Sequence, residues 1–142
     1  MKKQWVICAV LALNLTACAD KKNYEAAVLE DVKKEKDLET YHIEPEHMAD
    51  CVIDTTYQKM PGFFPFHPDR LVAYRNYAKM LSVAKSSDPK KTLEELRKEF
   101  GSPQELAKAH SIYTESVMDC FSAITQETES ETQSVIPKEP KG

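Results

Sequence analysis

The apolar pattern between residues 102 and 124 most constrains what this chain can fold into. Residues 102–105 (Ser-Pro-Gln-Glu) combine an N-cap serine, a first-turn proline and a capping-box glutamate, which mark the start of a helix. Behind this start, apolar residues recur in steps of three and four: Leu106, Ala109, Tyr113, Val117, Cys120, Phe121 and Ile124. A stripe of this length has to be buried against other helices. The pattern therefore predicts an all-α protein.

Three earlier segments carry the same kind of start signal and predict helices over residues 44–60, 67–86 and 88–101. Each has a proline in its first turn, and two of them are followed by the helix-ending residues proline or glycine. In the helix over 88–101 we expect Leu93, Leu96 and Phe100 to point inward. Together with the helix from 102, these segments predict a small bundle of four to five helices.

The N-terminus has the order of a secretory signal. Two lysines precede an apolar stretch over residues 5–13, and small residues follow before Cys18. The apolar stretch is too short to span a bilayer. Residues 1–17 are therefore expected to be a signal peptide that is removed from the mature protein.

The last residues of this signal, Leu15-Thr16-Ala17-Cys18, resemble the lipobox of bacterial lipoproteins. The resemblance implies that Cys18 is acylated, palmitate being one such chain, and becomes the first mature residue. Lipoproteins with an acidic residue directly after the cysteine tend to stay in the inner membrane, whereas Ala19 stands there in this chain. We therefore expect an outer-membrane lipoprotein on the periplasmic face. The alternatives are the inner membrane, or secretion with Cys18 unmodified.

The expected periplasmic location decides how the other cysteines are interpreted. Cys8 leaves with the signal and Cys18 would carry lipid, so Cys51 and Cys120 are the two thiols of the mature chain. In an oxidising compartment, two such cysteines predict one disulfide. Both cysteines fall on apolar helical stripes, which favours a structural bridge between the first clear helix and the last.

Two other uses of these cysteines are weaker alternatives. A redox-active pair normally has the close Cys-x-x-Cys spacing, which this pair lacks. A metal site could use His47 and Cys51 on one helix face, completed by His42, His110 or an acid, but zinc needs three or four converging ligands. We expect neither a metal nor another cofactor.

Composition and motifs argue against nucleic-acid binding and catalysis. The signal contains two of the 19 basic residues and none of the 23 acids, so the mature chain has a net charge of −6. Without a basic cluster, neither nucleic acid nor anionic lipid is an expected electrostatic partner. The chain also lacks a nucleophile elbow, a His-Glu-x-x-His zinc motif and a phosphate loop. We predict a protein that is not an enzyme and has no catalytic residue.

The chain divides into four regions on its composition. Residues 1–17 are the signal, residues 18–41 are a lipid anchor and charged, flexible tether, residues 42–125 are the helical domain, and residues 126–142 are a disordered tail. The apolar spacing of Tyr24, Val28 and Val32 leaves a docked first helix open as the alternative to a tether.

Two groups of aromatic residues are candidates for binding a partner. The segment over residues 61–68 holds three prolines with Phe63, Phe64 and Phe66, and cannot form a regular element. It is interpreted either as a buried plug, which we favour because exposed phenylalanines promote aggregation, or as an exposed binding loop. Tyr74 and Tyr77 are the second group, but we favour burial in the core for them because Tyr74 lies on an apolar helical stripe.

These features resemble pilotin-type outer-membrane lipoproteins, helical bundles that hold a partner helix in a groove and accompany secretin subunits. The resemblance lies in size, anchor, helix content and bridge. It implies a lipid-anchored binding module for an envelope protein. A structural envelope lipoprotein without a dedicated partner is the main alternative, and a metal-binding or enzymatic lipoprotein is the third. The oligomeric state does not follow from the sequence.

Overall fold

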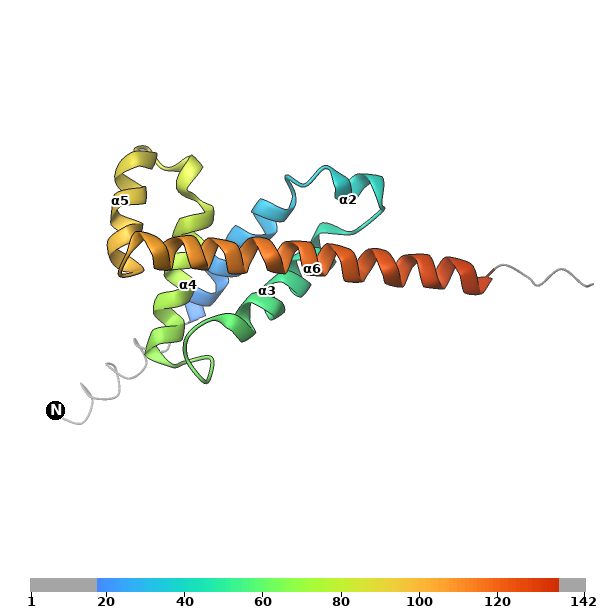
Figure 1. Cartoon of the computed structure of the whole chain (residues 1–142), viewed down its shortest axis with the longest axis horizontal. Coiled ribbons are helices and arrows are strands. Elements are labelled where there is room, and N and C mark those ends of the chain that lie inside the picture. The colour runs from blue at the N-terminus through green and yellow to red at the C-terminus, as the bar shows by residue number, and fades with distance from the viewer. Residues whose placement is uncertain (1–17, 136–142) are drawn as a thin grey trace, which may run out of the picture.

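Every regular element in the described part of the chain is helical, as predicted. The computed structural model describes the backbone of residues 18–135 and the side chains of residues 18–130. A helix over residues 18–32 comes first, and the elements after it are α2 (Asp37–Thr40), α3 (Pro45–Lys59), α4 (Pro68–Leu81), the 3₁₀ helix η1 (Val83–Lys85), α5 (Pro89–Glu99) and α6 (Pro103–Val135). Residues 1–17, the predicted signal, and residues 136–142 lie outside the described residues (Figure 1).

Four of these helices begin at a proline, and all four starts were predicted. A proline in the first turn sacrifices no intrahelical hydrogen bond, because its missing N–H would have no partner there. The side chains of His67, Asp88 and Ser102 each accept a hydrogen bond from a backbone N–H of the following turn, at 3.3, 3.0 and 3.1 Å. These caps fix where α4, α5 and α6 start.

The long helix α6 lies along α3 with the opposite chain direction (Figure 1). Its predicted stripe is buried at Leu106, Ala109, Tyr113, Cys120 and Ile124, and Val117 and Phe121 pack partly buried against the same core. Ser116 is also buried, and its hydroxyl donates to the Ile112 carbonyl at 2.7 Å. This bond satisfies a polar group that burial would otherwise penalise.

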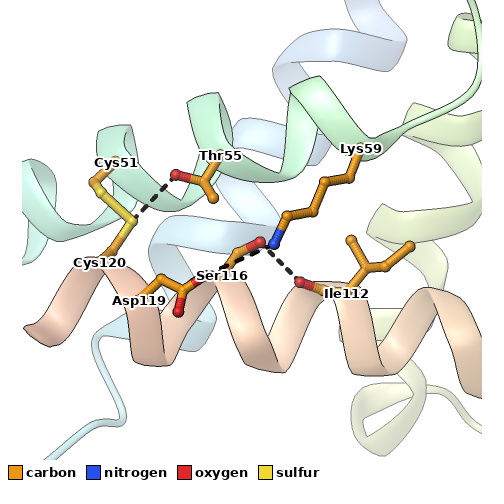
Figure 2. Close-up of a disulfide and its surroundings, with 7 residues drawn as sticks. All are labelled: Cys51, Thr55, Lys59, Ile112, Ser116, Asp119 and Cys120. Carbon is orange, nitrogen blue, oxygen red and sulfur yellow. Dashed lines mark hydrogen bonds and ion pairs between the residues drawn. A yellow bond between two sulfur atoms is a disulfide. The ribbon is translucent and has the colours of Figure 1, made fainter.

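A disulfide between Cys51 and Cys120 joins α3 to α6, as predicted (Figure 2). The two Cα atoms are 5.9 Å apart, which is an ordinary separation for a disulfide. The Thr55 hydroxyl lies 3.5 Å from the Cys120 sulfur. Because a bridged sulfur carries no proton, the hydroxyl is the donor. Cys120 is almost completely buried, which marks the bridge as structural.

The first helix, over residues 18–32, packs on the core. The chain therefore forms the docked helix there and not the flexible tether. Tyr24, Val28 and Val32 are each at most 1% exposed, and the Tyr24 ring stacks on the Tyr74 ring at 5.5 Å. Beyond Val32 the chain turns, and Leu38 and Ile43 return to the same core. The apolar spacing at these positions therefore reflects burial.

The C-terminal part of α6 continues to Val135, whereas the composition predicts a disordered tail from residue 126. Residues 126–130 are exposed, and in Figure 1 this part of α6 extends beyond the other helices. No proline interrupts the helix before Pro137. The Thr125 hydroxyl is satisfied within the helix, where it donates to the Phe121 carbonyl at 2.9 Å. Among the described helices, none combines the length and apolar character needed to cross a bilayer.

Candidate functional site

An open groove lies between α4, the end of α5 and α6, and its lining is mainly apolar. Its volume is about 500 Å³, within the range of small-ligand and peptide pockets. We call it the α4–α6 groove, and its apolar lining consists of Met60, Pro61, Val72, Ala73, Tyr77, Phe100, Ala109 and Ile112. Val72 is 44% exposed at its edge. The groove therefore offers an accessible apolar surface between well-packed helices.

Tyr77 lies in the lining of this groove but belongs mainly to the core. Its side chain is 3% exposed and meets the rings of Tyr24 and Phe100 edge-on, at 6.1 and 5.9 Å between centroids. Burial raises the pKa of Tyr77 to about 12. Tyr74 is 1% exposed. The favoured interpretation of these two tyrosines as core residues is therefore correct, and their rings pack against Tyr24 of the N-terminal helix rather than forming an exposed binding surface.

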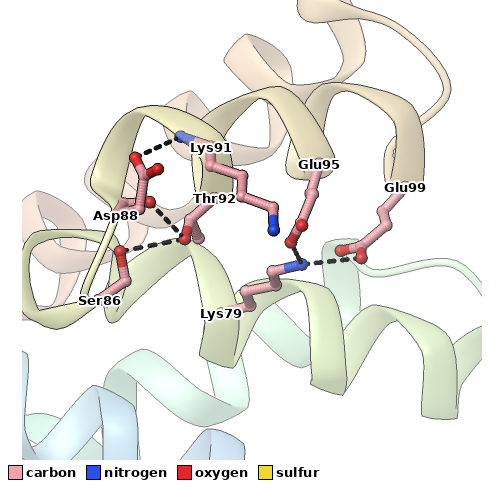
Figure 3. Close-up of polar contacts among 7 residues, drawn as sticks. All are labelled: Lys79, Ser86, Asp88, Lys91, Thr92, Glu95 and Glu99. Atoms are coloured by element: carbon pink, nitrogen blue, oxygen red, sulfur yellow. Dashed lines mark hydrogen bonds and ion pairs between the residues drawn. The ribbon is translucent and has the colours of Figure 1, made fainter.

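One wall of the groove is held in place by polar contacts between α4 and α5 (Figure 3). Lys79 lies between Glu95 and Glu99, with its ammonium nitrogen 2.9 Å from a carboxylate oxygen of each. Hydrogen bonds to Glu99 and Glu95 raise the pKa of Lys79. The buried side chain of Asn76 donates to the Glu99 carbonyl at 3.3 Å. These contacts bring the end of α5, and with it Phe100, against α4.

The segment over residues 61–67, which we call the aromatic loop, presents its phenylalanines to solvent. Phe63 is 97% exposed, Phe64 is 54% exposed and Phe66 is 63% exposed. The favoured prediction of a buried plug is therefore wrong, and the alternative of an exposed loop is correct. At the base of this segment Met60 and Tyr74 belong to the buried core, while the three phenylalanine rings stay outside it.

Arg70 holds the aromatic loop in shape. Its guanidinium group donates hydrogen bonds to the backbone carbonyls of Tyr57 and Gly62, and lies over the Tyr57 ring at 4.1 Å from the centroid. Gly62 has a φ of +96°, a conformation that glycine adopts without strain. Because Arg70 is only 4% exposed, the loop is fixed from beneath while its aromatic side chains face outward.

The predicted lipidation site, Cys18, is the first residue that the structure describes and lies in the first helix. Cys18 is exposed and has a free thiol. Two residues later, the Asp20 carboxylate pairs with Arg75 of α4 at 3.1 Å. The first helix is therefore already in contact with the helical domain at Asp20, two residues after Cys18.

The alternative metal site is not assembled. Cys51, one of its two proposed ligands, is bonded to Cys120. In the part of the chain that the structure describes, no three histidine, cysteine, aspartate or glutamate side chains come together in a group that could hold a metal ion. His47 is exposed on α3.

Sequence reasoning missed the α4–α6 groove, although it identified the helices around it. The alanine at position 109 could have indicated the groove, because a small residue on a long apolar stripe leaves space beside the helix. Val72 and Ile112 lie beside the predicted stripes, and nothing in the sequence around them indicated the groove. No protein-family model, curated protein or solved structure matches this chain.

Proposed function

We propose that this chain is a lipid-anchored interaction module of the bacterial cell envelope, facing the periplasm. It is attached through Cys18 and has no catalytic role. The α4–α6 groove holds an apolar segment of an envelope protein, in the manner of a pilotin-like assembly factor. The observation that carries the proposal is this groove, an uncovered apolar surface between packed helices.

The rim of the groove supports a protein segment as its occupant. The lining also contains charged residues of both signs, the basic Lys59 and Lys108 and the acidic Asp69, Glu99 and Glu105. A rim of mixed charge can pair with a segment whose apolar residues are flanked by polar ones. It gives no electrostatic advantage to a uniformly charged polymer.

The anchor rests on the resemblance of Leu15-Thr16-Ala17-Cys18 to a lipobox. The exposure of the Cys18 thiol supports the anchor, because an acyl chain attached there displaces no packed side chain. Mass spectrometry of the protein purified from bacterial membranes tests it. A first residue Cys18 carrying acyl groups is expected, and a free N-terminus elsewhere or an unmodified thiol would contradict it.

The groove is tested by site-specific photocrosslinking in cells. A benzophenone amino acid at Val72 places the probe at the groove edge, and the same amino acid at Met118, which is 65% exposed on α6 outside the groove, is the matched control. We expect one envelope protein to be crosslinked from Val72 and not from Met118. Adding Ile112→Lys inside the groove should abolish this crosslink while the circular dichroism spectrum stays unchanged.

The same experiment distinguishes the structural alternative. A lipoprotein that only spaces or stiffens the envelope has no dedicated occupant for the groove. It would give the same weak products from both probe positions, and Ile112→Lys would leave them unchanged. That result would refute the binding module.

A further inference from the structure

The aromatic loop and Cys18 lie at the same end of the molecule. Lys21, one helical turn after Cys18, and Pro65, within the aromatic loop, line one cavity of about 400 Å³ together with Tyr57 and Tyr74. In Figure 1 the start of the first helix and the connection between α3 and α4 are at the same lower side of the bundle. An anchor at Cys18 therefore brings the aromatic loop to the membrane as well.

No flexible spacer separates Cys18 from the helical domain. The Asp20–Arg75 ion pair and the buried Tyr24 ring dock the helix two and six residues after Cys18. A lipid on Cys18 then holds the domain directly on the bilayer and limits its orientation. The surface around Cys18, rather than any other face, is the one turned toward the lipid.

The loop itself has the chemistry of a membrane-contacting element. No charged residue occurs between Met60 and Phe66 in the sequence, and three phenylalanines in this stretch are more than half exposed. Each phenylalanine can bury roughly 150–250 Å² of surface. Because Arg70 and Gly62 already fix the loop, insertion would cost little additional ordering.

We infer that the aromatic loop inserts Phe63, Phe64 and Phe66 into the interfacial region of the phospholipid bilayer beside the acylated Cys18. The loop then acts as a second contact that orients the domain. This inference rests on the lipid anchor proposed above. A second membrane contact adds to an anchor because apolar area buried at the interface and acyl chains contribute together to membrane binding.

A tryptophan introduced into the loop reports its insertion, because the chain has a single tryptophan, Trp5, which lies in the predicted signal. Phe63→Trp is the reporter, and Leu93→Trp on α5 is the control, since Leu93 is exposed and α5 lies at the other end of α4 in Figure 1. Each lipoprotein is purified from membranes and reconstituted in vesicles of phosphatidylethanolamine and phosphatidylglycerol, with and without brominated acyl chains.

We expect brominated lipid to quench the indole at position 63 strongly and the indole at position 93 hardly at all. Adding Phe66→Glu to the Phe63→Trp protein should reduce the quenching to the level of the control, while the protein still floats with the vesicles. Equal quenching at positions 63 and 93, in protein whose Cys18 is acylated, would overturn the insertion and leave the anchor intact.

The mass of the purified protein distinguishes a failure of the proposed lipid anchor from a failure of the proposed loop insertion. If Cys18 carries no acyl group, the anchor fails, and the insertion fails with it because that anchor is what brings the loop to the bilayer. If the loop binds a protein instead, the indole at position 63 stays unquenched in pure lipid vesicles, which also overturns the insertion.

Discussion

The Tyr113 hydroxyl donates a hydrogen bond to the Asp31 carboxylate at 3.0 Å, and so joins α6 to the end of the first helix. Tyr113 is 5% exposed, and Asp31 also pairs with Lys34 at 3.0 Å. The bond connects residues 82 positions apart in the sequence. It is one of the contacts that keep the first helix on the bundle.

Removing this bond should weaken the domain measurably. Hydrogen bonds to charged groups contribute about 1.5–3 kcal/mol, and Lys34 remains to compensate Asp31, so we expect Tyr113→Phe to lower the free energy of unfolding by about 1.5 kcal/mol. Urea unfolding followed by circular dichroism measures this change. Tyr41→Phe is the control, because Tyr41 is 49% exposed. An equal effect of both substitutions would show that the Tyr113–Asp31 bond contributes nothing.

The buried tyrosines should make the protein sensitive to alkaline pH. Burial raises the pKa of Tyr24, of Tyr113 and, to about 12, of Tyr77. In the unfolded chain tyrosine titrates near pH 10, so above that pH the unfolded state binds fewer protons than the native state. The free energy of unfolding therefore falls as pH rises above about 10, by about 1.4 kcal/mol per pH unit for each such tyrosine.

Urea midpoints at a series of pH values, with tyrosinate absorbance recorded in parallel, test this alkaline effect. We expect a constant midpoint between pH 8 and pH 9 and a steep decline above pH 10, with a shallower decline in Tyr113→Phe. A midpoint that stays constant to pH 11 would show that these hydroxyl groups titrate equally in the folded and unfolded chain.

Two glycines with similar backbone angles should respond differently to alanine. Gly62 has a φ of +96° and a Cβ there would lie 2.9 Å from the Arg70 Cβ, whereas Gly101 has a φ of +93° with nothing within 4 Å. Gly101→Ala should cost about 1 kcal/mol from backbone strain alone. Gly62→Ala should cost about 2–3 kcal/mol, because the clash with Arg70 adds to that strain. Equal losses in urea unfolding would mean that the loop moves away without cost.

The disulfide should contribute much of the stability. It joins residues separated by 69 positions, and the chain-entropy estimate for a loop of this length is about 4 kcal/mol. Cys51→Ala combined with Cys120→Ala should lower the free energy of unfolding by about this amount, measured in urea against the oxidised protein. Thiol titration of denatured protein should find two additional thiols after reduction. If both thiols are free before reduction, the bridge does not form in the cell.

Features of the fold that depend on residues close together in the sequence were predictable, and features that depend on distant residues were less so. The starts at Pro45, Pro68, Pro89 and Pro103 depend on the geometry of a single turn, and all four are confirmed. Leu96 is buried as expected, but Leu93 on the same helix is 36% exposed. A helical stripe shows which face is apolar, and the width of its buried part depends on the neighbouring helices.

The candidate sites were harder to predict because they depend on elements distant in sequence. The aromatic loop faces outward since Arg70, on the next helix, bonds the carbonyls at its base. The α4–α6 groove arises where three elements meet, with Val72 on α4 and Ile112 on α6 facing the same space. No local pattern in the sequence records either arrangement.

The sequence by itself determined the helical class, the helix starts and the pairing of Cys51 with Cys120, because propensity, capping and the count of remaining thiols are properties of the chain alone. Tertiary structure decided the rest. It buried Tyr74 and Tyr77 and exposed Phe63, and it docked the first helix so that Lys21, three residues after Cys18, lines a cavity together with Pro65 of the aromatic loop. The physical reason is that exposure depends on which surfaces other elements cover, and that is set by packing between distant segments.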